Sequence, residues 1–191
     1  LPPVPAERNP GYVQPYTDSP LDGEPVGETV YLNLISKARR YVYITTPYLI
    51  VSDSVNTALC NAAKSGVDVR IMTPHIPDKK IIFEVTRAHY EPLLEAGVRI
   101  YEYTPGFVHG KNFAVDDCYA TVGSINMDYR SMFLHFEDGV WLCGAPAVLD
   151  VKKDFLDTLP VCQEITLARC RERSVLRRLL RAVLRVFAPL M

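Results

Sequence analysis

Four side chains in the middle of the chain are spaced for phosphate chemistry. His109 and Lys111 are two residues apart in an alternating stretch, and Ser124 and Asn126 are two residues apart further along. Residues i and i+2 of a strand point to the same face, so the members of each pair share a face. A tight turn at residues 116–117 predicts a hairpin that brings the two pairs together. An imidazole, an ammonium and two neutral hydrogen-bonding groups then converge on one spot.

Such a set of groups suits the transfer of a phosphate ester. An imidazole can attack phosphorus or protonate a leaving alcohol. Fixed donors hold the non-bridging oxygens as negative charge develops, and each can contribute about 3–4 kcal/mol. A lone His-x-Lys pair is typical of a solvated strand face. The functional interpretation is favoured here because Asp116, Gly123, Ser124 and Asn126 follow the pair at a regular spacing.

The complete spacing resembles a known motif. His109-x-Lys111, four residues, Asp116, six residues and then residues 123–126 (GSIN) match the H-x-K-x4-D-x6-G-S-x-N motif of the phospholipase D superfamily without a gap. Four further segments carry the resemblance: residues 46–48 (TPY), 74–79 (PHIPDK), 101–107 (YEYTPGF) and 126–131 (NMDYRS). Together they are similar to the C-terminal catalytic half of bacterial cardiolipin synthases, from about residue 28 to the C-terminus.

The resemblance implies a reaction that joins two phosphatidylglycerols into cardiolipin and releases glycerol. His109 would be one of two active-site histidines, of which one attacks phosphorus to form a phosphohistidine and the other protonates the leaving alcohol. Lys111 and Asn126 would hold the phosphate oxygens, with Ser124 helping. Glu137 matches the supporting acid of the next strand and would bond one imidazole nitrogen. The site is expected to need neither a metal nor any other cofactor.

Asp116 is the acid of the motif, but its place at a hairpin turn predicts a structural role. Arg130 could equally bind a lipid phosphate or a structural carboxylate. His75 lies in a loop flanked by prolines, where contact with a lipid headgroup and a structural turn are equally favoured. Tyr48 is predicted to be a packing residue.

Synthases of the family carry two such motifs, whereas this sequence contains one. His75, His89 and His135 are not followed by a lysine two residues later. The chain is therefore expected to supply half of a two-motif site. The other half would be a missing N-terminal domain or a second copy in a symmetric homodimer.

Two other functions remain open. A phosphodiesterase or nuclease of the same superfamily uses the same residues, and a non-catalytic lipid-binding half-domain could bind phosphate without turnover. A nucleic-acid partner is not expected, because binding nucleic acid usually requires a basic groove and the body of this chain is acidic.

The elements around the motif predict an α/β fold. Helices are predicted over about 28–39, 53–64, 78–96 and 147–159, and strands over 41–46, 67–73, 98–103, 107–115, 119–123 and 137–143. This alternation indicates a mixed or parallel sheet flanked by helices. The resemblance then implies a single phospholipase D-like domain, with a mixed β-sheet flanked by helices, over residues 28–162. An extended linker is predicted over residues 1–27 and a basic amphipathic tail over 163–191. No apolar run in the sequence has the 18–20 or so residues that a membrane-spanning helix needs.

The small net charge of −1 is the sum of a basic C-terminal segment and an acidic remainder. Residues 171–191 contain six arginines and one acid, a net charge of +5, and the remainder carries −6. Apolar residues recur at helical spacing over 175–187, with a basic face opposite. That face consists of Arg177, Arg178, Arg181 and Arg185. Such a helix can lie on an anionic membrane, although one packed on a partner domain has the same pattern. A membrane is slightly favoured, because the resemblance implies an anionic lipid substrate. The partners that the resemblance implies are phosphatidylglycerol and other anionic phospholipids at the cytoplasmic side of a bacterial cell membrane.

Overall fold

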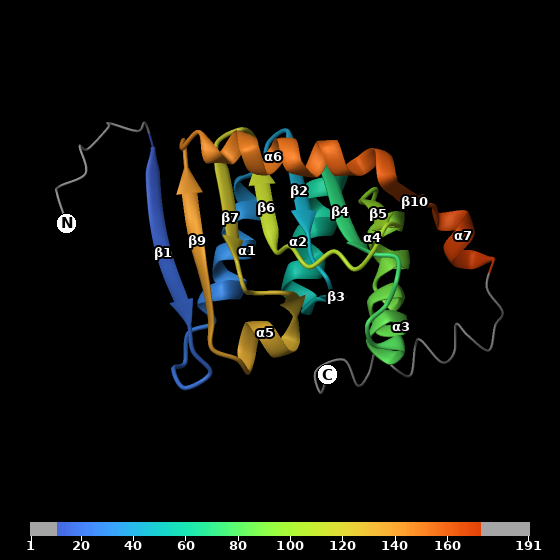
Figure 1. The fold of residues 1–191 in the computed structure, drawn as a ribbon, viewed down its shortest axis with the longest axis horizontal. Helices are drawn as coiled ribbons and strands as arrows, with labels where there is room; N and C mark the ends of the chain where they lie inside the picture. The colour runs from blue at the N-terminus through green and yellow to red at the C-terminus, as the bar shows by residue number, and fades with distance from the viewer. Residues whose placement is uncertain (1–10, 173–191) are drawn as a thin grey trace.

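The computed structural model describes residues 11–172, in which one large sheet carries helices on both faces (Figure 1). The predicted tail helix with Arg177, Arg178, Arg181 and Arg185 lies outside the described residues. The strands are β1 (Tyr12–Asp18), β2 (Tyr41–Thr45), β3 (Leu49–Ile50), β4 (Asp68–Pro74), β5 (Arg99–Tyr103), β6 (Asn112–Val115), β7 (Tyr119–Gly123), β8 (Met127–Asp128), β9 (Glu137–Cys143) and β10 (Cys162–Ile165). The helices are α1 (Val26–Lys37), α2 (Asp53–Lys64), α3 (Lys80–Ala88), α4 (Tyr90–Glu95), α5 (Tyr129–Phe133), α6 (Ala147–Thr158), the 3-10 helix η1 (Leu159–Val161) and α7 (Leu167–Arg171).

The large sheet is mixed, as the sequence predicts. Within the described residues its eight strands follow the order β1-β9-β7-β6-β2-β4-β5-β10, and β3 and β8 form a separate parallel pair. β2, β4 and β5 run parallel to one another. The strands on either side of these three pair antiparallel. The prediction of an α/β fold with a mixed sheet between helices is confirmed.

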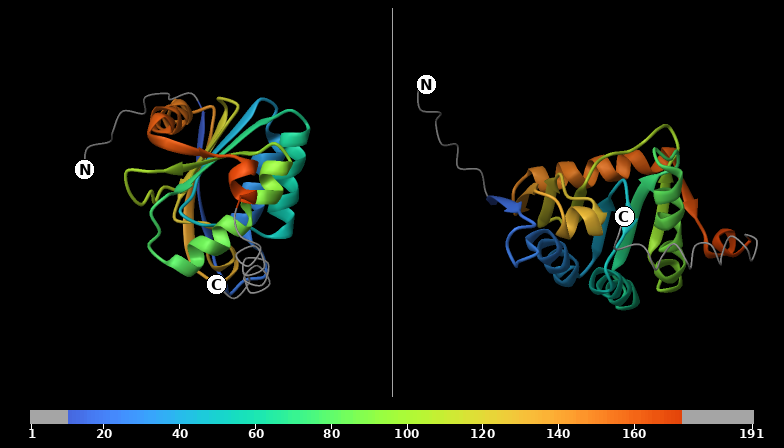
Figure 2. Two further views of the ribbon diagram at one scale, coloured as in Figure 1. Left: turned by 90° about the vertical axis from the view of Figure 1, so that its right-hand side faces the viewer. Right: turned by 90° about the horizontal axis from the view of Figure 1, so that it is seen from below.

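The two faces of the sheet are covered by different helices. Figure 2 shows α6 crossing one face and α1, α2 and α4 covering the other. Val42 and Ile44 of β2 belong to the larger core under α1, α2 and α4. Tyr43, which alternates with them, stacks on Phe155 of α6 with ring centroids 5.0 Å apart. Because both faces are covered, β2 is buried along its whole length and reads as a continuous apolar run.

Four strand ends next to the motif residues other than Asp116 meet at one edge of the sheet, where the parallel strands end. Thr45 at the end of β2 pairs with Asn112 at the start of β6. Asn112 in turn pairs with Val122 of β7, and Gly123 pairs with Gly139 of β9. The end of β2, the start of β6, the end of β7 and the start of β9 therefore meet. In open α/β sheets this carboxyl edge is the usual place for a ligand.

The predicted linker over residues 1–27 is corrected in part. Tyr12–Asp18 form the edge strand β1, which pairs antiparallel with β9 from Tyr12 opposite Cys143 to Asp18 opposite Glu137. Pro15 is compatible with this position because an edge strand does not need every backbone N–H. Asp18 is buried, and its Oδ2 accepts a hydrogen bond from the N–H of Gly27 at 2.6 Å. The strand therefore anchors the start of α1.

The predicted boundary at residue 162 is also displaced. β10 pairs antiparallel with β5 from Cys162 opposite Tyr103 to Ile165 opposite Ile100. Arg171 of α7 forms ion pairs with Glu91 and Glu95 of α4. Residues 162–171 are thus joined to the domain rather than forming the start of a separate tail.

The single helix predicted over 78–96 is two helices. α3 ends before His89, and α4 begins at Tyr90. Pro92 has no N–H to bond the carbonyl of Ala88, so one continuous helix is disfavoured there.

Within residues 11–172, no helix has both the length and the apolar character needed to cross a bilayer.

Candidate active site

His109 and Lys111 approach the sheet edge from the irregular segment that precedes β6. The sequence predicts them on a strand, but the strand begins at Asn112. The N–H of Gly123 donates to the carbonyl oxygen of Lys111 at 3.3 Å, which places Lys111 beside the end of β7. The Nζ atom of Lys111 lies 2.9 Å from Nδ1 and 3.2 Å from Nε2 of His109. It also donates to the carbonyl oxygen of His109 at 2.7 Å. The ammonium and the imidazole are therefore in direct contact.

The charges around this pair favour a neutral imidazole. Burial lowers the pKa of Lys111, and the carboxylates of Glu137 and Asp128 oppose that shift. Desolvation and the adjacent Lys111 ammonium lower the pKa of His109, while Asp78 acts in the opposite direction. A neutral imidazole is the form that can act as a nucleophile or base.

Ser124 is fixed in place by the start of β9. Its N–H donates to the carbonyl oxygen of Asp138 at 2.9 Å, and its Oγ accepts from the N–H of Asp138 at 3.0 Å. The Ser124 hydroxyl also donates to Oε2 of Glu137. A side chain on Gly123 would collide with the carbonyl of Asp138, which explains the glycine of the motif. The structure thus brings Glu137 to Ser124 and not to the imidazole of His109.

Asn126 belongs to a partly buried polar cluster at the start of α5. Its Nδ2 donates to Oγ of Ser131 at 2.9 Å. The N–H of Ser131 donates to Oδ1 of Asp128 at 2.7 Å, so Asp128 caps α5. Burial raises the pKa of Asp128. Among the described residues, nothing hydrogen-bonds to the buried Oδ1 of Asn126. No role of Asp128 and Ser131 is predicted from the sequence, although an aspartate directly before a short helix is a helix N-cap signal.

Asp116 lies at the far end of the hairpin, away from the motif edge. Its carboxylate accepts hydrogen bonds from the N–H groups of Arg39, Arg40 and Tyr41 at 2.6–2.9 Å. Asp116 and Asp117 both have positive φ, 54° and 60°, as a two-residue hairpin turn requires. The contacts of Asp116 therefore join the hairpin turn to the start of β2.

Arg130 and His75, the two candidates for contact with a lipid phosphate or headgroup, both contact other side chains of the chain. Nε of Arg130 donates to Nε2 of His135 at 3.1 Å on the surface. Nδ1 of His75 lies 2.8 Å from Oε2 of the fully buried Glu102. Glu102 also accepts two hydrogen bonds from Arg87, at 2.6 and 2.8 Å. His75 is thus held against a buried ion pair.

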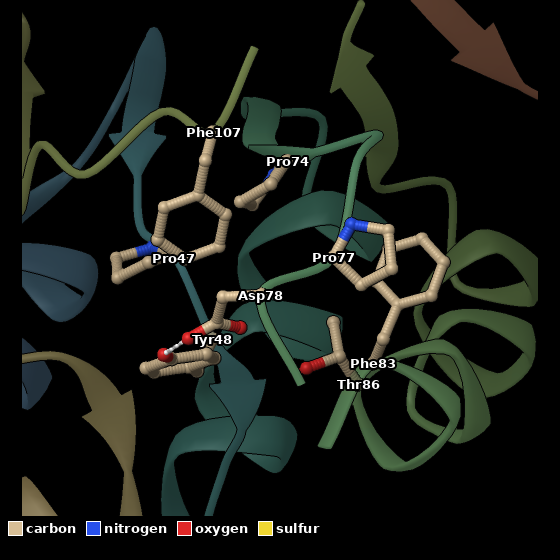
Figure 3. Close-up of a pocket in the computed structure, with 8 residues that line it drawn as sticks. All are labelled: Pro47, Tyr48, Pro74, Pro77, Asp78, Phe83, Thr86 and Phe107. Atoms are coloured by element: carbon tan, nitrogen blue, oxygen red, sulfur yellow. Dashed lines mark hydrogen bonds between the residues drawn. The ribbon is translucent and has the colours of Figure 1, made fainter. Parts of the chain in front are cut away.

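A small hollow lies beside the imidazole. The ring of Phe107 is 5.7 Å from the ring of His109 and 6.2 Å from that of Tyr48, measured between centroids. Figure 3 shows the hollow, which is shallow and partly open to solvent. Its lining residues are Pro47, Tyr48, Pro74, Pro77, Asp78, Phe83, Thr86 and Phe107. The sequence predicts Tyr48 as a packing residue, but its hydroxyl donates to Oδ2 of Asp78 inside this hollow.

No group of three or more His, Cys, Asp or Glu side chains in residues 11–172 is arranged to hold a metal ion. The sheet edge presents imidazole, ammonium, amide and hydroxyl groups. With the mixed sheet that carries them, these groups define a phospholipase D-like domain.

The family model described as "Cardiolipin synthase, PLD-like domain" matches residues 31–159. The chain belongs to this family, and the resemblance seen in the motif is confirmed.

Individual relatives agree with the family match. A cardiolipin synthase from Halalkalibacterium halodurans is 36% identical over 184 residues, which cover 96% of this chain and 37% of that protein. An uncharacterized protein from Streptococcus mutans is 47% identical over 181 residues, 95% of this chain and 39% of that protein. The solved structure of Nuc, a phospholipase D family member from Salmonella typhimurium, has the same fold, with a TM-score of 0.70, 18% identity and coverage of 82% of this chain and 99% of that chain. The chain thus spans less than two fifths of the length of these two relatives.

Proposed function

We propose that this chain is one half of a phosphatidyltransferase that makes cardiolipin from two phosphatidylglycerols and releases glycerol. The observation that carries the proposal is the contact between the Lys111 ammonium and the His109 imidazole at the motif edge. The cardiolipin synthase relatives supply the substrate class.

The proposed reaction proceeds through a phosphohistidine. One histidine of the complete site attacks the phosphorus of the donor lipid, and the bond from phosphorus to the glycerol oxygen breaks. The other histidine donates the proton that the departing glycerol takes up. A hydroxyl of the second phosphatidylglycerol then attacks the phosphohistidine and returns its proton to that same histidine. One phosphodiester replaces another, so the covalent intermediate carries the group and no nucleotide is consumed.

The residues of the edge have defined tasks in this reaction. A bound phosphate would give Nζ of Lys111 an anionic oxygen in place of the imidazole, which frees the ring to react. Asn126 can turn its amide to present Nδ2 to the same phosphate, because its Oδ1 would then accept from the Ser131 hydroxyl. Glu137 positions Ser124 and sets the charge around Lys111.

The second histidine must come from outside this copy of the chain. We infer that it comes from an N-terminal half with its own motif or from a second copy across a symmetric interface. The proposed partners are therefore phosphatidylglycerol, other anionic phospholipids on the cytoplasmic face of a bacterial membrane, and this second half. The predicted basic face of residues 177–185 would provide the attraction to that surface.

The proposal is tested by mixing the chain with phosphatidylglycerol vesicles, alone over a range of concentrations and together with a separately produced N-terminal half. Cardiolipin and free glycerol should appear in equal amounts in at least one arrangement, as measured by mass spectrometry. His109→Ala should abolish both products. Asp154→Asn, an exposed substitution on α6, should leave them unchanged.

The same experiment separates the alternatives. Vesicle binding without turnover in every arrangement would contradict catalysis and favour the lipid-binding module. Phosphatidic acid without cardiolipin, or cleavage of DNA at a rate that lipid does not affect, would favour a phosphodiesterase. The solution mass shows whether activity depends on a second copy of the chain.

A further inference from the structure

The hollow beside His109 combines apolar walls with one charged group. Prolines and aromatic rings form most of its lining, and the carboxylate of Asp78 is the ionised group among them. Figure 3 shows this carboxylate and the Tyr48 hydroxyl meeting inside the ring of prolines and aromatic side chains. A few fixed polar groups in an otherwise apolar concavity are the usual composition of a small-molecule site.

The Asp78 carboxylate is held in place and retains capacity to bind a ligand. Its Oδ1 accepts the N–H of Lys79 at 2.6 Å, and its Oδ2 accepts the hydroxyl of Tyr48. An ionised carboxylate has about four acceptor positions, so these two bonds leave room for further donors. Burial and the neighbouring carboxylate raise the pKa of Tyr48, so the phenol stays protonated and continues to donate.

We propose that this hollow, the Asp78 pocket, binds the glycerol hydroxyls of the phosphatidylglycerol that accepts the phosphatidyl group. In this arrangement the secondary hydroxyl of the headgroup donates to Asp78, and the adjacent terminal hydroxyl is directed toward the phosphohistidine. The inference rests on the proposed function and adds the residues that select the acceptor alcohol.

The size and charge of the pocket favour a polyol over the other parts of a phospholipid. The hollow is shallow and encloses far less space than the roughly 300–1,000 Å³ of a drug-sized ligand site, so it suits the hydroxyl groups of a small headgroup better than an acyl chain. The negative charge of Asp78 repels a phosphate. A cationic headgroup is disfavoured because the guanidinium of Arg87 already lies 4.1 Å from the ring centroid of Phe83.

The pocket is also at the correct place for an acceptor. Phe107, one of its lining residues, is two positions before His109 and packs near its ring. Asp78 is close enough to His109 to act on its protonation. Pro47 follows β2, and Pro74 ends β4, so the pocket and the motif share one sheet edge.

A binding experiment tests the pocket without catalysis. Glycerol, 1-propanol and ethanolamine are titrated into the isotope-labelled chain, and amide chemical shifts are followed by NMR. Glycerol should give saturable shifts at Tyr48, Thr86 and Phe107, and 1-propanol, which lacks the adjacent hydroxyls, should not. Asp78→Asn should remove the glycerol shifts, and Asp154→Asn, a matched change on α6, should keep them. Equal shifts with 1-propanol, shifts with ethanolamine only, or shifts that survive Asp78→Asn would overturn the inference.

A kinetic experiment separates this inference from the proposed function. In the arrangement that makes cardiolipin, Asp78→Asn and Tyr48→Phe should raise the KM for acceptor lipid about tenfold, the effect expected from losing one hydrogen bond to a charged group. Release of the first glycerol should continue, and more phosphatidic acid should form as water replaces the acceptor. Wild type without cardiolipin contradicts the proposed function. Wild-type activity with an unchanged acceptor KM in both variants contradicts the Asp78 pocket alone.

Discussion

At His109, the protonation state of one ring depends on a lysine two residues away. Lys111 is buried, and its ammonium touches the imidazole. Each proton added to His109 must therefore be placed beside an existing positive charge, which is the second cause, after desolvation, of the lowered pKa. The contact therefore favours the neutral form of the ring.

We predict that His109 titrates below the ordinary histidine value of 6.5 and that Lys111→Met moves its midpoint upward. A lowered pKa means that the neutral form persists to more acidic pH and is lost only as the pH falls through the midpoint. Removing the ammonium removes one of the two causes of this shift. NMR titration of the His109 ring protons measures both midpoints.

The control for this titration is Lys153→Met, which removes an exposed lysine on α6 that pairs with Asp157. It should leave the midpoint of His109 unchanged. A midpoint above 6.5 in wild type, or one that does not rise in Lys111→Met, would contradict the electrostatic account.

At this scale the sequence predicts the candidate reacting groups but not the residues that position them. The spacing of the motif locates His109, Lys111 and Ser124, because such a pattern is rare by chance. It does not reveal the contact between Ser124 and Glu137 or the cluster of Asn126 with Ser131, which depend on how α5 and β9 approach the edge.

Among the elements, the hairpin of β6 and β7 depends on a carboxylate far from the chemistry. The carboxylate of Asp116 accepts hydrogen bonds from three backbone N–H groups in the segment that begins β2. These hydrogen bonds can be removed by changing the Asp116 side chain alone, without moving another helix or strand. We therefore expect substitution of Asp116 to change the free energy of unfolding.

We predict that Asp116→Ala lowers the free energy of unfolding by about 2 kcal/mol. Three donors lose a charged acceptor, and the loss is limited because water can reach the exposed ones. Asp116→Asn should lose less, because asparagine keeps an acceptor and tolerates the positive φ of the turn. Urea denaturation measures the difference, and the titration midpoint of His109 should stay the same in both variants. A stable variant with a changed midpoint would assign Asp116 to the site instead.

The two edge strands that the sequence does not predict, β1 and β10, are missed for the same reason. The strongly apolar strands such as β2 are recognised because they are buried on both faces. β1 is mostly exposed and contains a proline, so only its pairing with β9 makes it a strand. The short strand β10 likewise has one neighbour, β5. Edge strands depend on long-range hydrogen bonds that local sequence does not encode.

For the whole molecule, the described sheet begins and ends with these two edge strands. β1 pairs with β9, and the first residue of β9, Glu137, accepts a hydrogen bond from the Ser124 hydroxyl. Asp18 lies opposite Glu137 and binds the start of α1, and the Tyr16 hydroxyl is 2.9 Å from Oγ1 of Thr121 on β7. The segment predicted as a linker therefore supports the same edge that carries the chemistry.

Deletion of residues 1–18 should lower the free energy of unfolding by roughly 2–4 kcal/mol, because β9 loses the backbone partners on one of its two sides and Asp18 no longer anchors α1. The exposed edge of β9 should also pair with other copies, so larger species should form. Urea denaturation and light scattering after size-exclusion chromatography measure the two effects. Deletion of residues 1–10 leaves β1 in place and should match the full chain. A shorter chain that stays equally stable and unassociated would show that β1 is a linker after all, with no part in supporting Glu137.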